Sequence, residues 1–190
     1  MKNLAIWLGT LLSLVAPAAA VGQGTDASAR EAAALELLPR PTIINPTEVT
    51  VEAARARVRA RPRDADAWHQ LGESLDVAGD LDEAVAAYER ATRLPPRVLG
   101  RAFLYRDLAD ALERAGELDR AVAAARVSVR SWPLSRDGLH CMGHEVRLLT
   151  RLLVKTHDLA GAAAFYAPLY EADPQHEECQ RLHEALSGTE

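Results

Sequence analysis

A 34-residue period organises the middle of this 190-residue chain and strongly restricts its fold. Residues 65–98 read ADAWHQLGESLDVAGDLDEAVAAYERATRLPPRV. Apolar and small residues fall at positions 4, 7, 8, 11, 20, 24 and 27 of this unit, occupied by Trp68, Leu71, Gly72, Leu75, Ala84, Tyr88 and Ala91. The first four lie on one face of a helix and the last three on one face of a second helix. The pattern predicts two packed helices, with Trp68 and Tyr88 as packing residues.

The residues between and after these two helices have the chemistry of turns and helix ends. Gly79 is a residue that accepts the left-handed backbone of a helix C-terminus. Asp80 stands three residues before Glu83, which predicts a capping box for the second helix. Pro96 is expected to end that helix.

Two further copies follow at residues 102–135 and 143–176. The second copy keeps most of the pattern. The third is degenerate, since His157 replaces the turn glycine and Leu169 replaces the small residue at position 27. A packing helix is predicted before the first copy, at about residues 47–61, and a lone terminal helix at residues 175–187.

The residues at these positions resemble the tetratricopeptide repeat (TPR) family. The resemblance covers about residues 47–187. It implies an all-α, helix-turn-helix repeat solenoid with about three TPR-like repeats and flanking packing helices, in which the first helix of each repeat lines a concave groove. Such proteins hold other proteins or peptides, so the resemblance implies a protein–protein interaction scaffold or assembly factor. Exported bacterial relatives serve envelope assembly, secretion and cytochrome maturation.

The resemblance also implies which side chains face the groove. At repeat positions 2, 5, 9 and 12 or 13, these are Asp66, His69, Glu73, Asp76, Phe103, Arg106, Asp110, Glu113, His144, Arg147, Arg151 and Lys155. The set changes from acidic to basic along the chain, which favours a peptide or protein of opposite polarity. The alternative is that these are solvated surface charges without a ligand. A clamp for chaperone C-terminal carboxylates is not supported, because His69, Glu73 and Arg106 occupy the clamp positions.

The N-terminus has the features of a secretory signal. Lys2 precedes an apolar stretch from Leu4 to Val15, and Ala18 to Ala20 form a signal-peptidase site. We therefore predict a signal peptide at residues 1–20 and a bacterial protein that is periplasmic or secreted, with a retained anchor as the alternative. Residues 21–46 are predicted to be a linker or tether, in which a short helix could form from Ala29 to Leu38.

Composition and motifs argue against several functions. The formal net charge is −5, so the chain does not have the basic surface that nucleic acids or anionic lipids attract. The sequence contains no phosphate-binding glycine loop, serine elbow or HExxH zinc motif. We therefore predict a protein that is not an enzyme and uses no cofactor.

Both cysteines and four of the six histidines cluster in two short segments of the sequence. Three interpretations remain open: a disulfide between Cys141 and Cys179, two reduced cysteines, or a zinc or copper site formed by Cys141, His144, His176 and Cys179. The last would make the chain a small periplasmic metal-handling protein, which is the alternative to a scaffold. A repeat module that serves only oligomerisation is a third possibility.

Overall fold

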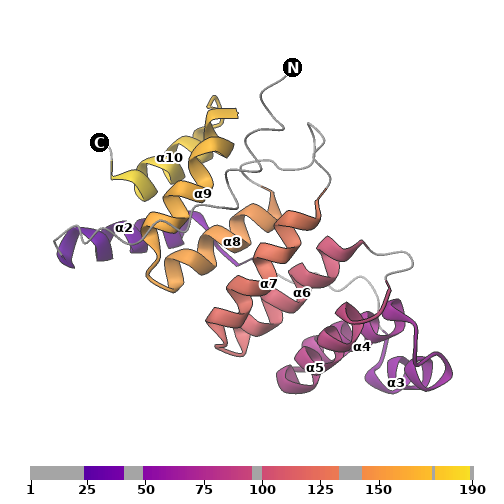
Figure 1. Cartoon of the computed structure of the whole chain (residues 1–190). Helices are drawn as coiled ribbons and strands as arrows, with labels where there is room; N and C mark the ends of the chain where they lie inside the picture. Colours follow the sequence, from indigo (N-terminus) through magenta and orange to yellow (C-terminus); the bar gives the residue numbers. More distant parts are fainter. Residues whose placement is uncertain (1–23, 41–48, 96–99, 133–142, 173, 189–190) are drawn as a thin grey trace. The chain divides into compact units, whose positions relative to one another are not determined.

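The computed structural model describes residues 24–40, 49–95, 100–132, 143–172 and 174–188 (Figure 1). Within these ranges all regular structure is α-helical. The predicted all-α helical-repeat fold is therefore confirmed. The chain divides into two compact units. One contains residues 49–95 and 100–132, and the other combines residues 24–40 with residues 143–172 and 174–188.

In its described residues, 49–95 and 100–132, the first unit contains five consecutive helices. They are α3 (Val51–Ala60), α4 (Ala65–Ala78), α5 (Leu81–Thr92), α6 (Arg101–Arg114) and α7 (Leu118–Ser131). Each helix packs against the next one in the chain, as expected for helix-turn-helix repeats. We refer to this part as the α3–α7 unit. Its α4–α5 and α6–α7 pairs lie within the first and second sequence repeats.

Local sequence explains where these helices begin and end. Thr50 caps α3 by accepting a hydrogen bond from the backbone N–H of Ala53, and Asp64 caps α4 through the N–H of Asp66. Gly79 ends α4 with a left-handed φ of 89°. Asp80 is the N-cap residue of α5, but its side chain makes no capping hydrogen bond. The predicted Asp80–Glu83 capping box is therefore not formed.

Small residues bring the paired helices close together. Gly72 of α4 lies against the ring of Tyr88 on α5, and a Cβ atom at Gly72 would stand 2.6 Å from two ring carbons. Tyr88 is buried, whereas Trp68 is half-buried and donates its indole N–H to the carbonyl of Pro62 at 2.9 Å. Glycine at this repeat position therefore makes room for a large aromatic residue on the facing helix.

Replacing Gly72 with alanine is expected to destabilise the α3–α7 unit by about 1–3 kcal/mol, because the buried Tyr88 ring has no room to move away from the new methyl group. Alanine is the better helix former, so helix propensity alone predicts the opposite sign. Urea unfolding of G72A measures the change. Gly100→Ala is the control, because a Cβ there would make an ordinary 3.8 Å contact with Phe103. A G72A chain as stable as the wild type would contradict this packing.

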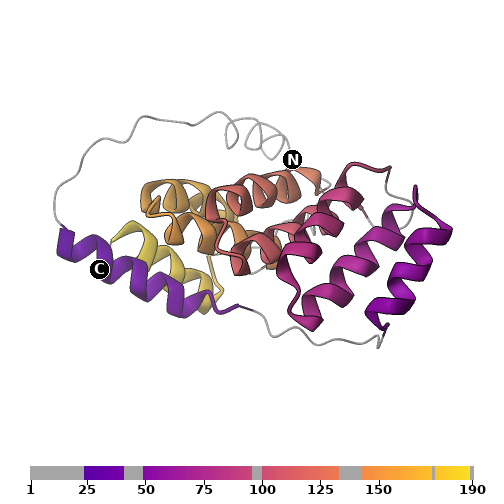
Figure 2. The same cartoon turned by 90° about the horizontal axis from the view of Figure 1, so that it is seen from below.

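The second unit combines α2 (Gly24–Leu37) with α8 (His144–Lys155), α9 (Leu159–Ala172) and α10 (Glu177–Ser187). We refer to it as the α2/α8–α10 unit. α8 packs on α9 and α9 on α10, as in consecutive repeats, while α2 packs against both α8 and α10. Figure 2 shows α2 running alongside α10 although the two are far apart in the sequence.

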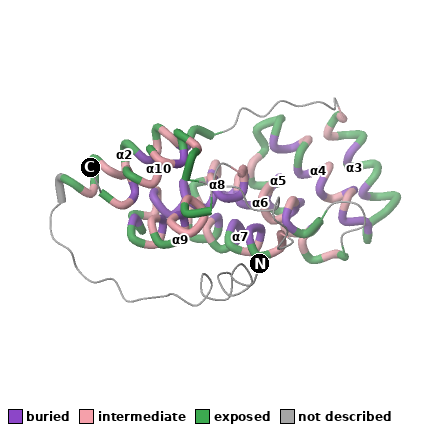
Figure 3. Tube along the Cα trace, turned by 90° about the horizontal axis from the view of Figure 1, so that it is seen from above, coloured by how far each residue is buried: buried purple, intermediate pink, exposed green. Residues whose placement is uncertain are grey.

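The core of this unit is formed where its helices face one another (Figure 3). Its largest fully buried side chains include Tyr166, Leu148, Leu152, Leu182 and Leu186. The turn between α8 and α9 has His157 at a φ of 60°, where the other repeats have glycine. Histidine is one of the few side chains found in this region with some frequency. The degenerate third repeat thus keeps the turn geometry without the glycine.

Residues 21–46 were predicted to be a linker or tether. The described residues 24–40 of this segment instead contain the helix α2. α2 is longer than the short helix considered for residues 29–38, and it is packed rather than free. Ala34 and Leu38 are almost fully buried. Helix α2 is alanine-rich, and its small side chains allow close approach to the neighbouring helices. The predicted signal peptide lies outside the described residues.

Candidate functional site

First helices carry the residues expected to face a groove, and these residues are divided between the two units. Eight belong to α4 and α6 in the α3–α7 unit and four to α8 in the α2/α8–α10 unit. Each unit therefore has its own first-helix surface. No membrane-spanning helix is found among the described residues, since none is long and apolar enough.

Several of the expected groove side chains are buried rather than solvated. His69, Asp76, Glu113 and Arg151 are each at least nine-tenths buried. These four side chains are therefore covered by other residues of the chain, and their assignment to a partner groove stays a prediction. Glu73 is exposed, and the rest are half-buried: Asp66, Phe103, Arg106, Asp110, His144, Arg147 and Lys155.

Two polar contacts connect α4 to α6 in the α3–α7 unit. His69 Nε2 lies 2.6 Å from Asp107 Oδ2, and further along the two helices Arg114 donates to the carboxylate of Asp76. Both pairs are separated by 38 residues. Because polar groups leave water only when they find a partner, these contacts explain why His69 and Asp76 are buried. Sequence analysis missed Asp107 and Arg114, which complete the two pairs.

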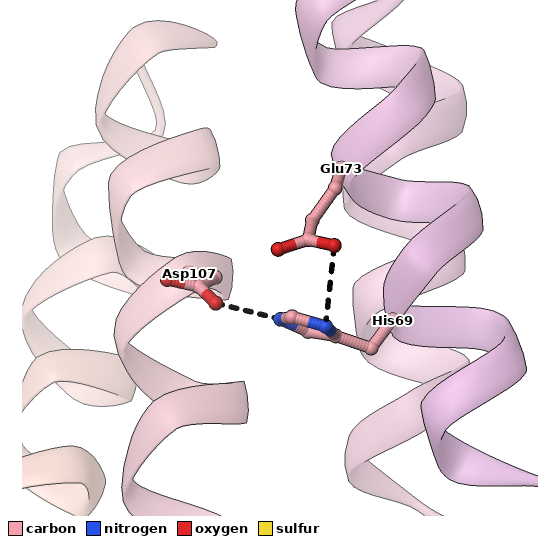
Figure 4. A group of neighbouring side chains, drawn as sticks. All are labelled: His69, Glu73 and Asp107. Atoms are coloured by element: carbon pink, nitrogen blue, oxygen red, sulfur yellow. Dashed lines mark hydrogen bonds and ion pairs between the residues drawn. The ribbon is translucent and has the colours of Figure 1, made fainter. Parts of the chain in front are cut away.

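His69 is at the centre of a cluster with Glu73 and Asp107 (Figure 4). Glu73 stands one turn beyond His69 on α4, and its Oε2 lies 3.8 Å from His69 Nδ1. Asp107 extends from α6 and also accepts a hydrogen bond from Arg106 Nε at 2.8 Å through its other oxygen. The imidazole thus has a carboxylate near each ring nitrogen.

Burial and charge act in different directions on these carboxyl groups. Burial opposes ionisation of Asp107, but the hydrogen bond from His69 and the nearby Arg106 outweigh it, so the pKa of Asp107 lies below its usual value. Glu73 is partly exposed, but partial desolvation by the neighbouring helices raises its pKa, and the Asp107 carboxylate adds to this effect. Burial likewise raises the pKa of Asp76 despite its pairing with Arg114. Negative charge is therefore concentrated on this face of the unit.

The first-helix surface of the α2/α8–α10 unit is covered by α2. Arg147 and Arg151 of α8 donate to the carbonyls of Leu37 and Pro39 at 3.2 and 3.5 Å, just where α2 ends. In the opposite direction, Arg30 of α2 donates to the carbonyls of Ala185 and Leu186 near the end of α10. Arginines thus satisfy the unpaired carbonyls at the C-termini of two helices.

These contacts change the interpretation of the basic residues in the third repeat. Arg147 and Arg151 were expected to bind a partner, but in this structure they hold a helix of the same chain. His157 reinforces the docking, since its Nδ1 lies 3.0 Å from a carboxylate oxygen of Glu31 on α2. No feature of α8 alone could have revealed which carbonyls its arginines would meet.

Cys179 is buried in α10 and is disulfide-bonded. Cys141, the other cysteine of the chain, lies outside the described residues, so the Cys141–Cys179 pairing stays a prediction. A disulfide sulfur is not a thiolate. Cys179 in this state does not supply the ligand required by the metal site considered with Cys141, His144 and His176.

Comparison with known proteins agrees with this architecture. The tetratricopeptide repeat family model matches residues 65–96, which contain α4 and α5. The MamA RS-1 ArsTM double mutant is similar with a TM-score of 0.58 and 16% identity, covering 88% of this chain and 86% of that chain. TTC0263, a thermophilic TPR protein in Thermus thermophilus, gives a TM-score of 0.50 and 22% identity, covering 72% and 71% respectively. No curated protein sequence matches.

Residues 65–96 are therefore similar to a tetratricopeptide repeat. The family match rests on the first repeat, and the similarity to solved structures extends the same fold over most of the chain.

Proposed function

We propose that the chain is an exported scaffold or assembly factor that binds a protein or peptide through the first helices α4 and α6. The observation that carries this proposal is the docking of α2 on α8 and α10. A first-helix surface of this chain already holds a helix, using buried Ala34 and Leu38 together with arginine contacts to backbone carbonyls. The surface of α4 and α6 is built from equivalent helices of the neighbouring repeats.

The charges of α4 and α6 define the kind of partner that fits. Helix α4 contains three acidic and no basic residues, and α6 contains three of each, so the pair has an excess of three negative charges. The half-buried Phe103 adds an apolar contact surface, and its ring lies 5.4 Å from that of Trp132. A basic amphipathic segment is complementary to this combination.

Two features support the exported location. The first twenty residues have the composition of a signal peptide, and Cys179 is disulfide-bonded, as is common in oxidising compartments outside the cytoplasm. Fractionation of expressing bacteria, followed by mass measurement of the mature chain, tests this directly. An intact N-terminus on a cytoplasmic protein would refute export.

The binding proposal is tested by reversing charges on the first helices. In a chain carrying Glu73→Lys and Asp110→Lys, we expect affinity for a partner captured from the cell envelope to fall at least about tenfold, because rim and interface charges set complementarity. The partner is identified by crosslinking and mass spectrometry, and its affinity is then measured by titration. Circular dichroism verifies that the variant is folded.

The matched control makes the same charge changes on the second helices, at Asp82 and Asp119, which both lie outside the first-helix surface on α5 and α7. This D82K/D119K chain should bind like the wild type. Equal binding by both double variants, or equal loss in both, would refute the assignment of the site to α4 and α6.

A further inference from the structure

We propose that His69, Glu73 and Asp107 form a binding site for a zinc ion that links α4 to α6. One ligand atom from each residue can be chosen so that all three lie within 4.8 Å of one another. Zinc binds histidine nitrogen and carboxylate oxygen at about 2.0–2.2 Å, so two ligands of one ion are at most about 4.4 Å apart. In a tetrahedral site the ligand atoms are about 3.4 Å apart. The 2.6 Å contact between His69 Nε2 and Asp107 would therefore open, and the Glu73 carboxylate would move from Nδ1 toward the ion at Nε2.

The backbone already places these ligands correctly. His69 and Glu73 are four residues apart on α4, a spacing that puts both side chains on the same face of a helix. Asp107 approaches the imidazole from α6, and Arg106 holds its other oxygen. Metal-binding carboxylates are commonly oriented by such a second hydrogen bond. A zinc ion bound at His69 Nε2 would take the place of the hydrogen bond between His69 and Asp107.

The charge of the surroundings also favours a divalent cation. Four carboxyl groups influence one another here, those of Glu73, Asp76, Asp107 and Asp110, while Arg106 and Arg114 are the arginines among them. When ionised, the four carboxylates outnumber the two arginines by two negative charges, which one divalent ion balances. Asp76 Oδ1 is buried and has no hydrogen-bond partner among the described residues. The two arginines therefore do not balance the negative charge of the four carboxylates.

The donor set favours a transition metal such as zinc over magnesium or calcium. An imidazole nitrogen suits zinc, whereas magnesium and calcium prefer all-oxygen sites. Three protein ligands leave a coordination position for water, as in zinc sites that are not purely structural. This site is independent of the cysteine-containing cluster considered from the sequence, and it does not require a partner protein.

The test is calorimetric titration of the purified disulfide-intact chain with zinc chloride, in parallel with magnesium chloride. We expect one zinc ion per chain, a higher unfolding temperature with zinc, and much weaker binding of magnesium. Glu73→Gln is the decisive variant because it removes a ligand but leaves the His69–Asp107 contact in place. Its zinc affinity should fall at least about 10–100-fold, the loss seen even when only an outer-shell partner is removed.

Two further chains complete the design. His69→Asn should also lose zinc binding, whereas His183→Asn should retain it, since His183 stacks on Tyr170 in the other unit. Cobalt(II) gives an optical spectrum of the same site that should disappear in E73Q. The absence of stoichiometric zinc binding, equal affinity in E73Q and the wild type, or equal affinity for magnesium and zinc would each overturn the proposal.

Discussion

Tyr166→Ala is expected to lower the free energy of unfolding of the α2/α8–α10 unit by about 3–5 kcal/mol, the usual cost of truncating a fully buried aromatic side chain. Tyr166 has no exposed surface and is the largest of the fully buried side chains in the described structure. It occupies position 24 of the third repeat, the place of Tyr88 in the first. Hydrogen exchange followed by mass spectrometry measures the loss, because it reports on α8–α10 separately from α3–α7.

Tyr170→Ala is the matched control for this change. Tyr170 is on the same helix but is only half-buried, stacked on His183 with ring centroids 4.3 Å apart. Its removal should cost clearly less than that of Tyr166. Equal costs would mean that the third repeat does not pack in the register described above.

Leu38→Ala should destabilise the same unit by about 2–5 kcal/mol, because it leaves a cavity where α2 meets the unit. Leu38 follows the last residue of α2 and is 1% exposed. We expect amides of α2 to exchange faster, with α4–α7 unchanged. This result would establish α2 as part of a folded core rather than as a tether.

Leu37→Ala controls for the loss of an apolar side chain at the neighbouring position, since Leu37 is half-buried and contributes its backbone carbonyl to Arg147. That carbonyl is retained in the variant. Protection of α2 that is the same in L38A and the wild type would show that α2 is not held by its apolar contacts.

The repeat architecture could be predicted because packing imposes a period on the sequence. Alternating small and large residues such as Gly72 and Tyr88 are required wherever two helix backbones approach closely, so they are visible without a structure. The turn conformation of His157 was less obvious, since glycine is the usual residue there. The turn could still be predicted, because His157 occupies the position at which the other repeats have glycine.

The partners of polar side chains were much harder to predict. His69 was expected to face a partner groove, and the structure shows that Asp107 of the next repeat contacts it. A signal was present, since His69–Asp107 and Asp76–Arg114 have the same separation of 38 residues. Two complementary pairs at a constant offset indicate contacts between successive first helices.

The docking of α2 had no such periodic signal. Its sequence is rich in alanine and not strongly divided into polar and apolar faces, so it predicts a helix without indicating where that helix packs. Arginine donates to any carbonyl or carboxylate within reach. The sequence was therefore equally consistent with Arg147 and Arg151 binding an external ligand and with their binding the carbonyls at the end of α2.

The discontinuity of the α2/α8–α10 unit also has a consequence for biosynthesis. A ribosome makes α2 before the α3–α7 unit and makes α8 and α10 after it. The α3–α7 unit can assemble as its helices emerge, whereas α2 has to wait until α8 and α10 have been made before its packing partners exist. During that interval the buried face of α2 is accessible to chaperones, and a chain that stops before α10 leaves it without its main partner.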